Sequence, residues 1–512
     1  MRQGDTGGAR RWGTSGPERA HVEPAPGPER GPEWPRVAGR LHATMERGSL
    51  IDDPIGPALL RLAWPVIAGE ALHTAFHLVD IAWVGPLGAW ATGAIMTSMF
   101  TLWIAFALMN LVSVGLSAHV SQAVGAGRAD DAGRMVALSL WLAALLSLPA
   151  AALRWFGAGS LFRLLVDDVQ VANAGAAYLR VVALGLPLSF ISTTLAAAMR
   201  ACGNTRTPLL IGAAAVLANI ALAPLFVYGL GPIPAMGVTG SAIATLICQL
   251  GAMLAALRLA AARRSDLPVD RASLRRPDLR AIRDIARVGA PYFFVGALFS
   301  AVYLYYAHLA GAFGAAAIAV LGIGNRIESI TYLSADGFAV AASVFVGQNL
   351  GAGDPDRAER GAWRAAWIMS AAAALMGLVL LAIPEPFVAI FTRDPEALAL
   401  GVSWLRVLAA CQVFTGLEGV IGGGFAGAGD TIPPTIIHVV FAILRVPLAW
   451  WAVMGLGMGP MGIVWTMTLT CIARGIIVAL WFRRGAWKTK RLSPAPAPLP
   501  AAEGPDSSSE AL

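Results

Sequence analysis

The sequence predicts an all-α integral membrane protein: twelve transmembrane helices in two six-helix lobes, related by a pseudo-two-fold axis along the membrane normal. Composition is the first observation, because 57% of the 512 residues are hydrophobic and only 13% are charged, well below soluble domains. The second is that apolar runs of about 20 residues alternate with polar breaks, and each such run can cross a hydrocarbon core of roughly 30 Å. The third is an internal repeat that relates the two halves of the chain.

Twelve candidate spans follow one another along the chain. Their ranges are 60–84, 88–114, 134–156, 174–200, 208–229, 236–260, 285–310, 315–346, 362–384, 398–424, 433–455 and 460–483. The second and eighth spans are longer than a bilayer requires, which indicates tilt or an extension beyond the membrane.

Basic residues gather on alternate connections between these spans. The connection after the sixth span is rich in arginine, Arg483 ends the twelfth span, and Arg484 and Lys488 follow it. The intervening connections, such as 85–90 and 455–462, are nearly uncharged. By the positive-inside rule, both termini and the central linker are expected in the cytoplasm. The excess of positive charge therefore sets the topology, and no nucleic-acid partner is expected.

These patterns divide the chain into five segments. They are a disordered cytoplasmic tail (1–50), an N-lobe (51–262), a cytoplasmic linker (263–284), a C-lobe (285–487) and a second disordered cytoplasmic tail (488–512). Both tails are rich in small residues and proline and have no apolar run, so neither is expected to pack. The N-terminal tail lacks the apolar core of a signal peptide.

The internal repeat holds a constant offset of 226 positions over most of each half. It takes Pro65 to Pro291 and aligns SQAVGAGRADDAGR (121–134) with GQNLGAGDPDRAER (347–360). Each half contains an even number of spans, so both halves enter the membrane in the same direction. Parallel repeats of this kind can rock against each other and open a central path to either side in turn. The repeat therefore favours a secondary transporter.

Six motifs carry a family resemblance. In order they are LVDIAWVGPLG (78–88), QAVGAG (122–127), AMRACGNTRTP (198–208), GNRIES (324–329), QNLGAG (348–353) and GAGDTIPP (427–434). Through them, residues 55–485 resemble the multidrug and toxic compound extrusion (MATE) transporters, nearest to the DinF-like bacterial branch. The resemblance implies a monomer in the bacterial inner membrane that exports cationic or amphipathic small molecules in exchange for H⁺ or Na⁺. No GxxxxGK[ST] motif occurs, so an ion gradient rather than ATP is expected to drive transport, without a cofactor.

The first span carries four ionisable residues: Glu70, His73, His77 and Asp80. Their spacings of three, four and three place them on one helical face. Ionisable groups cost about 2.5–3.5 kcal/mol inside a membrane, so this face is predicted to line a cavity. Asp80 is the primary candidate for ion coupling, because a carboxylate can bind a proton, Na⁺ or a cationic drug. A carboxylate that only holds helices together is the alternative.

The resemblance also implies partners for Asp80. Asn219 in the fifth span and Thr245 in the sixth match the family's ion site, whereas Ala223 stands where the family has a second acid. The loss of an oxygen ligand favours H⁺ over Na⁺. His77 is either a proton relay beside Asp80 or a residue hydrogen-bonded within the bundle. No second helix offers metal ligands that would match the Glu-x-x-His spacing, so no metal is expected.

The second half has diverged from the first at these positions. Tyr306 aligns with Asp80, and Asp336 aligns with Asn110. The residues assigned to the substrate cavity are Glu70, His73, His77, Asn110, Tyr306 and Asp336. Those assigned structural or gating roles are Gln122, Gln348, Arg326, Glu328, Pro65 and Pro291, with Arg326 and Glu328 in ion pairs and the prolines as hinges. Glu418 and Arg445 are further ionisable residues within the second half.

Three other functions stay open. A lipid-linked precursor flippase or polysaccharide exporter of the same superfamily would need two further spans and a strongly basic cavity. A membrane-embedded enzyme would use the Glu70, His73, His77 and Asp80 face, but the duplication and the lack of a second ligand cluster argue against it. A channel would need a symmetric ring of pore residues. Transport without enzymatic activity is expected.

Overall fold

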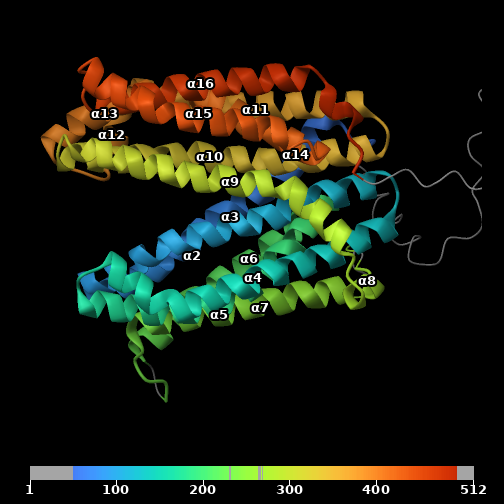
Figure 1. Cartoon of the computed structure of the whole chain (residues 1–512), viewed down its shortest axis with the longest axis horizontal. Helices are drawn as coiled ribbons and strands as arrows, with labels where there is room; N and C mark the ends of the chain where they lie inside the picture. Colours follow the sequence, from blue (N-terminus) through green and yellow to red (C-terminus); the bar gives the residue numbers. More distant parts are fainter. Residues whose placement is uncertain (1–49, 230–231, 263–266, 268, 493–512) are drawn as a thin grey trace, which may run out of the picture.

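The computed structural model describes residues 50–229, 232–262, 267 and 269–492, which fold into helices and connecting turns (Figure 1). The helices of the first half are α2 (Ile55–Val84), α3 (Ala89–Gly125), α4 (Ala129–Leu165), α5 (Val169–Ala201), α6 (Arg206–Tyr228) and α7 (Gly237–Ala261). Short α8 (Arg271–Arg275) lies in the central connection. The second half contains α9 (Leu279–Gly311), α10 (Ala315–Gly351), α11 (Pro355–Ala382), α12 (Pro384–Ala389), α13 (Pro395–Ala409), α14 (Gln412–Ala428), α15 (Ile432–Trp450) and α16 (Met461–Arg483). Short turns η1 (Gly85–Leu87), η2 (Trp451–Gly455) and η3 (Ala486–Thr489) complete the described chain.

Within the described residues, 11 helices are long and apolar enough to cross a membrane, or 12 if the bent pair α13 and α14 is one span. The prediction of an all-helical membrane protein is thus confirmed. The tenth span, expected as one helix over 398–424, is instead broken and bent by 50°. No proline causes the break. The Cys411 thiol and the Gln412 amide both donate to the Leu408 carbonyl, and such side-chain hydrogen bonds compete with the helical ladder.

Helix ends extend beyond several predicted spans. Helix α9 begins at Leu279, inside the segment expected as the linker, because the Asp278 carboxylate accepts hydrogen bonds from the Arg280 and Ala281 amides. Asp354 caps the Arg357 amide in the same way at the start of α11. An aspartate at this position satisfies amides that have no partner in the first helical turn. Spans predicted from hydropathy alone therefore begin later than the helices, because the capped first turns are polar.

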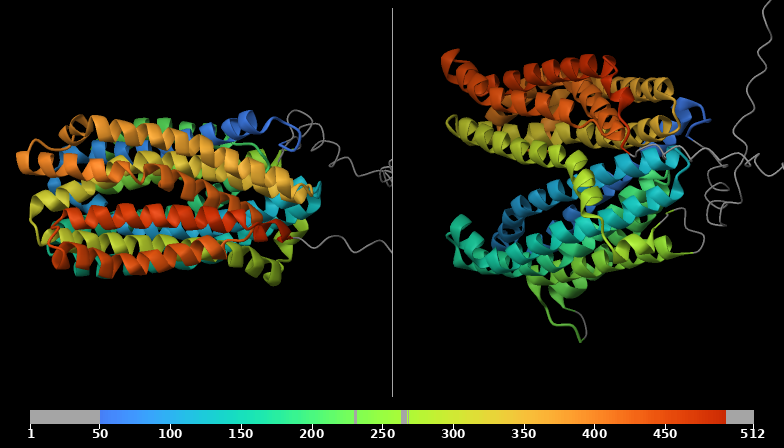
Figure 2. Two further views of the ribbon diagram at one scale, coloured as in Figure 1. Left: turned by 90° about the horizontal axis from the view of Figure 1, so that it is seen from above. Right: turned by 45° about the vertical axis from the view of Figure 1, so that its right-hand side comes forward.

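The two halves form separate lobes that meet at one end. Figures 1 and 2 show α2–α7 in one lobe and α9–α16 in the other, with their ribbons converging toward the end where the described chain begins and finishes. Helices α2 and α3 of the first lobe pack there against α10 and α9 of the second. These pairings are equivalent under the repeat, so the structure has the predicted pseudo-two-fold arrangement.

The segment after α16 packs on the closed end of the molecule. Trp487 is fully buried and stacks on Phe482 with ring centroids 4.4 Å apart. The Lys488 ammonium forms ion pairs with Asp356 at 2.9 Å and Glu359 at 2.6 Å. The expectation of a disordered tail from residue 488 is therefore wrong for 488–492. Residues 493–512, and the N-terminal tail up to residue 49, lie outside the described part.

Candidate functional site

Asp80 lies deep in the first lobe and is surrounded by hydroxyl and amide groups. Its side chain is buried on α2, and Ser241 Oγ of α7 donates to its Oδ1 at 3.1 Å. Thr245 Oγ1 donates to Oδ2 at 3.1 Å, and Asn219 Nδ2 of α6 donates to Thr245 Oγ1 at 3.5 Å. The structure thus brings Asp80, Asn219 and Thr245 together from three helices. Among the described residues, no basic side chain lies within ion-pair distance of Asp80.

Close packing of α6 against α7 positions the neutral ligands of this site. A Cβ atom at Gly240 would lie 2.2 Å from the Phe226 carbonyl oxygen, so only glycine permits this approach. Ala223, which stands at the expected second acid, is fully buried. The Oδ1 atom of Asn219 is also buried, and no described residue donates a hydrogen bond to it. A buried carbonyl oxygen without a donor is costly, and a proton or cation held at Asp80 would supply the missing partner.

Ser241 is a hydrogen-bond partner of Asp80 that sequence reasoning missed. It precedes Thr245 by one helical turn in the motif GSAIAT, so both hydroxyls reach the same carboxylate. The spacing was a usable signal, because residues four apart share one helical face. Tyr178 of α5 was missed as well, and it is buried close enough to interact electrostatically with Asp80.

In the described chain, no other ionisable residue of α2 hydrogen-bonds to the Asp80 carboxylate. The rings of His73 and His77 meet edge to face, with centroids 4.8 Å apart, and neither ring hydrogen-bonds to Asp80 in the described chain. Glu70 interacts electrostatically with Arg200 of α5 and with Asp336 of α10 in the opposite lobe. The exposure of Asp336 in the middle of α10 shows that it faces open space. Polar groups of both lobes therefore border one shared region.

The two remaining cavity candidates differ in exposure. Asn110, the repeat partner of Asp336, is half-buried on α3. Tyr306, the repeat partner of Asp80, is fully buried inside the second lobe, and its hydroxyl has no hydrogen-bond partner among the described residues. In this structure Tyr306 therefore does not border the open space between the lobes. An aromatic ring at this position packs into the apolar core that α9 shares with α10 and α13.

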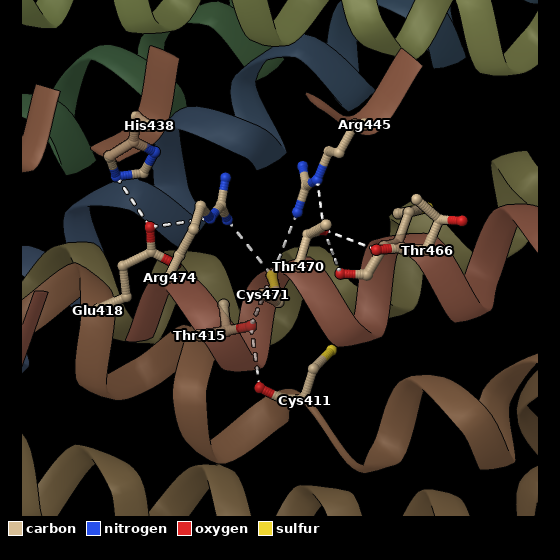
Figure 3. A network of polar contacts seen from close by, with 10 residues as sticks. Cys411, Thr415, Glu418, His438, Arg445, Thr466, Thr470, Cys471 and Arg474 are labelled. Carbon is tan, nitrogen blue, oxygen red and sulfur yellow. Dashed lines mark hydrogen bonds and ion pairs between the residues drawn. The ribbon is translucent and has the colours of Figure 1, made fainter. Parts of the chain in front are cut away.

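A buried polar network occupies the second lobe (Figure 3). One oxygen of Glu418 lies 3.0 Å from His438 Nε2 and 3.1 Å from Arg474 Nε. Arg474 Nη2 also lies 3.3 Å from the Cys471 sulfur. Arg445, which aligns with Asn219 in the repeat, donates to Thr470 Oγ1 at 2.7 Å. The second lobe thus has fixed guanidinium charges where the first lobe has neutral ligands.

Glu328 belongs to the edge of this network. The Tyr303 hydroxyl donates to Glu328 Oε2 at 3.5 Å. A carboxylate oxygen of Glu328 and the sulfurs of Cys411 and Cys471 lie within 4.8 Å of one another. The expected ion pairs of Arg326 and Glu328 are not formed with each other, because Arg326 is exposed whereas Glu328 is buried. Residues two apart on a helix face different directions, which the shared motif does not reveal.

We expect Glu418→Gln to destabilise the protein by about 3–5 kcal/mol, because it leaves the Arg474 guanidinium buried without its counter-charge. Thermal unfolding of the purified protein in detergent measures the loss. Asp356→Asn is the matched control, since its ion pair with Lys488 is exposed and exposed pairs contribute about 0–1 kcal/mol. A double variant Glu418→Gln, Arg474→Gln should recover stability. Equal unfolding temperatures for Glu418→Gln and the wild-type protein would show that the pair is not structural.

Gln122 and Gln348 form equivalent hydrogen bonds across the junction of the lobes. Gln122 Nε2 at the end of α3 donates to the carbonyls of Gly427 at 3.3 Å and Ala428 at 3.1 Å, at the end of α14. Gln348 Nε2 at the end of α10 donates to the Ala201 carbonyl at 2.8 Å, at the end of α5. Ala201 is the repeat partner of Gly427. Each glutamine thus satisfies a helix C-terminus of the opposite lobe.

Glycines let the backbones of the two lobes touch at this junction, which we call the interlobe seal (residues 121–126 and 347–352). A Cβ at Gly125 would lie 1.9 Å from the Gln348 carbonyl oxygen, and one at Gly351 would lie 2.1 Å from that of Gln122. A Cβ at Gly347 would meet Ser121 Oγ at 1.9 Å, and these two positions are themselves repeat partners. The pseudo-two-fold axis therefore passes through the seal.

Pro65 and Pro291 lie inside α2 and α9, next to two further crossings of the lobes. A Cβ at Gly337 would lie 2.2 Å from the Ile67 side chain, and one at Gly289 would lie 1.8 Å from the Leu111 carbonyl oxygen. A proline removes one backbone hydrogen bond of its helix and permits a bend. Each proline is thus placed where its helix leaves the opposite lobe.

Comparison with known proteins agrees with this architecture. The family model MatE matches residues 65–225 and again 291–451, which confirms the repeat in the predicted register. The probable multidrug resistance protein NorM of Thermotoga maritima is 27% identical over 440 residues, covering 84% of this chain and 93% of that protein. An FAD transporter of Shewanella oneidensis is 27% identical over 445 residues, covering 84% of this chain and 95% of its own.

The fold has solved counterparts as well. One is described as the outward-facing conformation of a multidrug resistance MATE family transporter of the MOP superfamily. It superposes with a TM-score of 0.80 at 22% identity, covering 86% of this chain and 98% of that chain. At this identity the likeness concerns the fold, whereas the two family-model matches cover more than half of the sequence. The chain therefore belongs to the MatE family of multidrug and toxic compound extrusion transporters, and it is not an enzyme.

Proposed function

We propose that this protein exports cationic or amphipathic small molecules in exchange for H⁺, with Asp80 as the residue that binds the coupling ion. The observation that carries the proposal is the buried Asp80 carboxylate, which has hydroxyl and amide neighbours but no basic partner within the described residues. A buried anion without a counter-charge is stabilised by a bound proton or cation. Na⁺ is the second coupling ion that this oxygen-rich site accommodates, with Asn219 and Thr245 as further ligands.

The substrate would bind between the lobes, where Glu70 and Asp336 provide negative charge and Asn110 provides an amide. Phe106 on α3, whose ring lies beside that of His73 with centroids 6.1 Å apart, adds apolar surface for an organic cation. Transport follows if the coupling ion and the substrate favour opposite arrangements of the lobes. Opening the interlobe seal would then turn the binding region toward the other side of the membrane.

The orientation of the protein follows from its charge pattern. We place the interlobe seal, both termini and the arginine-rich connection 263–284 in the cytoplasm, in a bacterial inner membrane. In this orientation the described arrangement is closed toward the cytoplasm. A monomer suffices, because both lobes belong to one chain. The acidic site in the first lobe and the lack of an acid at Tyr306 support a place in the DinF-like branch.

The proposal is tested by transport in proteoliposomes with pH and Na⁺ gradients imposed separately. Uptake of a fluorescent organic cation against its gradient is expected when a pH difference is present, and not with Na⁺ alone. Transport driven by a Na⁺ gradient alone would show that Na⁺, and not H⁺, is the coupling ion. Transport of FAD but not of organic cations would instead place the protein with its Shewanella relative in substrate class.

A further inference from the structure

A groove lies on the outer surface of α11, beside the beginning of α2. Its volume is about 710 Å³, and residues from both helices line it. Ile55 of α2 lines it together with Arg360, Trp363, Arg364, Trp367 and Ile368 of α11. Glu359, whose carboxylate pairs with Lys488, lines it as well. An exposed apolar stripe continues from Trp367 through Leu375 and Leu378, so this face of α11 borders the bilayer.

Two arginines line the groove, and Arg360 interacts with the Asp356 carboxylate only beyond ion-pair distance in the described chain. Arg360 and Arg364 are exposed and one helical turn apart, and neither takes part in an ion pair there. The charged residues around them are already engaged. Arg357 donates to the backbone carbonyls of Leu50 and Asp53. Lys488 pairs with Asp356 and with Glu359, and Arg61 pairs with the Asp53 carboxylate. Two positive charges thus face the groove together.

The remaining lining is apolar and aromatic. Trp363 and Trp367 are also one turn apart, and they alternate with the two arginines along α11. Tryptophan prefers the region between headgroups and hydrocarbon, and arginine binds phosphate through paired N–H donors. A basic pocket between helices at the cytoplasmic side is the kind of site that anionic lipid headgroups occupy.

We propose that this groove binds an anionic phospholipid, with its phosphate at Arg360 and Arg364 and an acyl chain along Trp367 and Ile368. The occupant is a membrane lipid rather than a soluble anion, because the apolar wall opens onto the bilayer. The groove joins α2 of the first lobe to α11 of the second, next to the interlobe seal. A bound lipid would therefore hold the two lobes together at this end. The site lies outside the proposed transport path and does not depend on which ion is coupled.

Native mass spectrometry of the full-length protein in detergent tests the proposal directly. The delipidated protein is titrated with phosphatidylglycerol or with phosphatidylcholine of the same chain length. Phosphatidylglycerol is expected to bind preferentially to the wild-type protein. Arg360→Gln, Arg364→Gln should weaken its binding by roughly 30-fold, because each arginine near an anionic headgroup contributes about a factor of five.

The double variant Arg283→Gln, Arg287→Gln is the matched control. These two arginines are also exposed and one helical turn apart, and they lie at the N-terminal end of α9. This control should retain phosphatidylglycerol binding. Trp367→Ala leaves both charges in place but removes the apolar contact with the acyl chain. It should therefore also weaken phosphatidylglycerol binding. Equal loss in both arginine pairs, or equal binding of the two lipids by the wild-type protein, would overturn the proposal.

Discussion

Asp80→Asn is expected to abolish gradient-driven transport, reducing it to the level of protein-free liposomes. The variant removes the only carboxylate of the first-lobe site in the described chain, so a proton or cation is no longer exchanged there. An asparagine oxygen still accepts hydrogen bonds from Ser241 and Thr245, so the fold should persist. Uptake of a fluorescent cation under an imposed pH gradient measures the effect.

Two controls separate coupling from folding in this experiment. The unfolding temperature of Asp80→Asn should stay near that of the wild-type protein, and the variant should still bind substrate. Thr245→Ser, which keeps the hydroxyl that donates to Asp80, should retain most of the transport activity. Uphill transport by Asp80→Asn at the wild-type rate would exclude Asp80 as the coupling residue.

Gly351→Ala should force open the interlobe seal. The added Cβ would lie 2.1 Å from the Gln122 carbonyl oxygen, a backbone atom that cannot rotate away, so the ends of α3 and α10 must separate. Conformations of a transporter differ by only a few kcal/mol, so this clash should shift the population toward a state open at that end. Transport should fall strongly, because the cycle requires both states.

Thiol accessibility measures this opening. Ser121 is fully buried in the seal, and Ser121→Cys serves as a nearly isosteric reporter for a membrane-impermeant maleimide. Its labelling should rise about tenfold or more when Gly351→Ala is added. Gly251→Ala is the matched control, because a Cβ at that helical position meets nothing within 4 Å. Unchanged labelling in Gly351→Ala would show that the seal does not hold this end closed.

Much of the fold could be predicted from the sequence because membrane insertion and duplication leave regular patterns. Apolar runs marked the spans, and the offset between Pro65 and Pro291 matched the register of the two MatE repeats. The break between α13 and α14 could not be predicted, since it arises from side-chain hydrogen bonds to the Leu408 carbonyl rather than from a proline or glycine. The packing of 488–492 depends on residues remote in sequence, because Lys488 pairs with acids of α11 and the Leu492 amide donates to Gln122 Oε1.

The site was only partly accessible to sequence reasoning. The family resemblance named Asp80, Asn219 and Thr245, and the structure places these three together. The common helical face suggested that His77 could contact Asp80. In the structure the His77 ring contacts the His73 ring instead. The burial of Tyr306 could not be predicted either, because its alignment with Asp80 in the repeat does not reveal whether the ring is exposed.

The divergence of the lobes gives the repeat a functional meaning. The positions that join the lobes stay paired, as Gln122 with Gln348 and Gly125 with Gly351 show. The positions inside each lobe have separated in chemistry, because Arg445 replaces Asn219 and Tyr306 replaces Asp80. We therefore expect ion exchange in the first lobe, while the ion-paired second lobe moves as a rigid partner.

Proton release on substrate binding tests the central claim most directly. Purified wild-type protein in weakly buffered detergent solution is mixed with a saturating organic cation, and the pH of the solution is followed with an indicator. If a proton at Asp80 is exchanged for substrate, the wild-type protein releases protons in near-stoichiometric amount, and Asp80→Asn releases none although it binds the same cation. Undiminished release by Asp80→Asn would contradict the assignment of Asp80 as the coupling site.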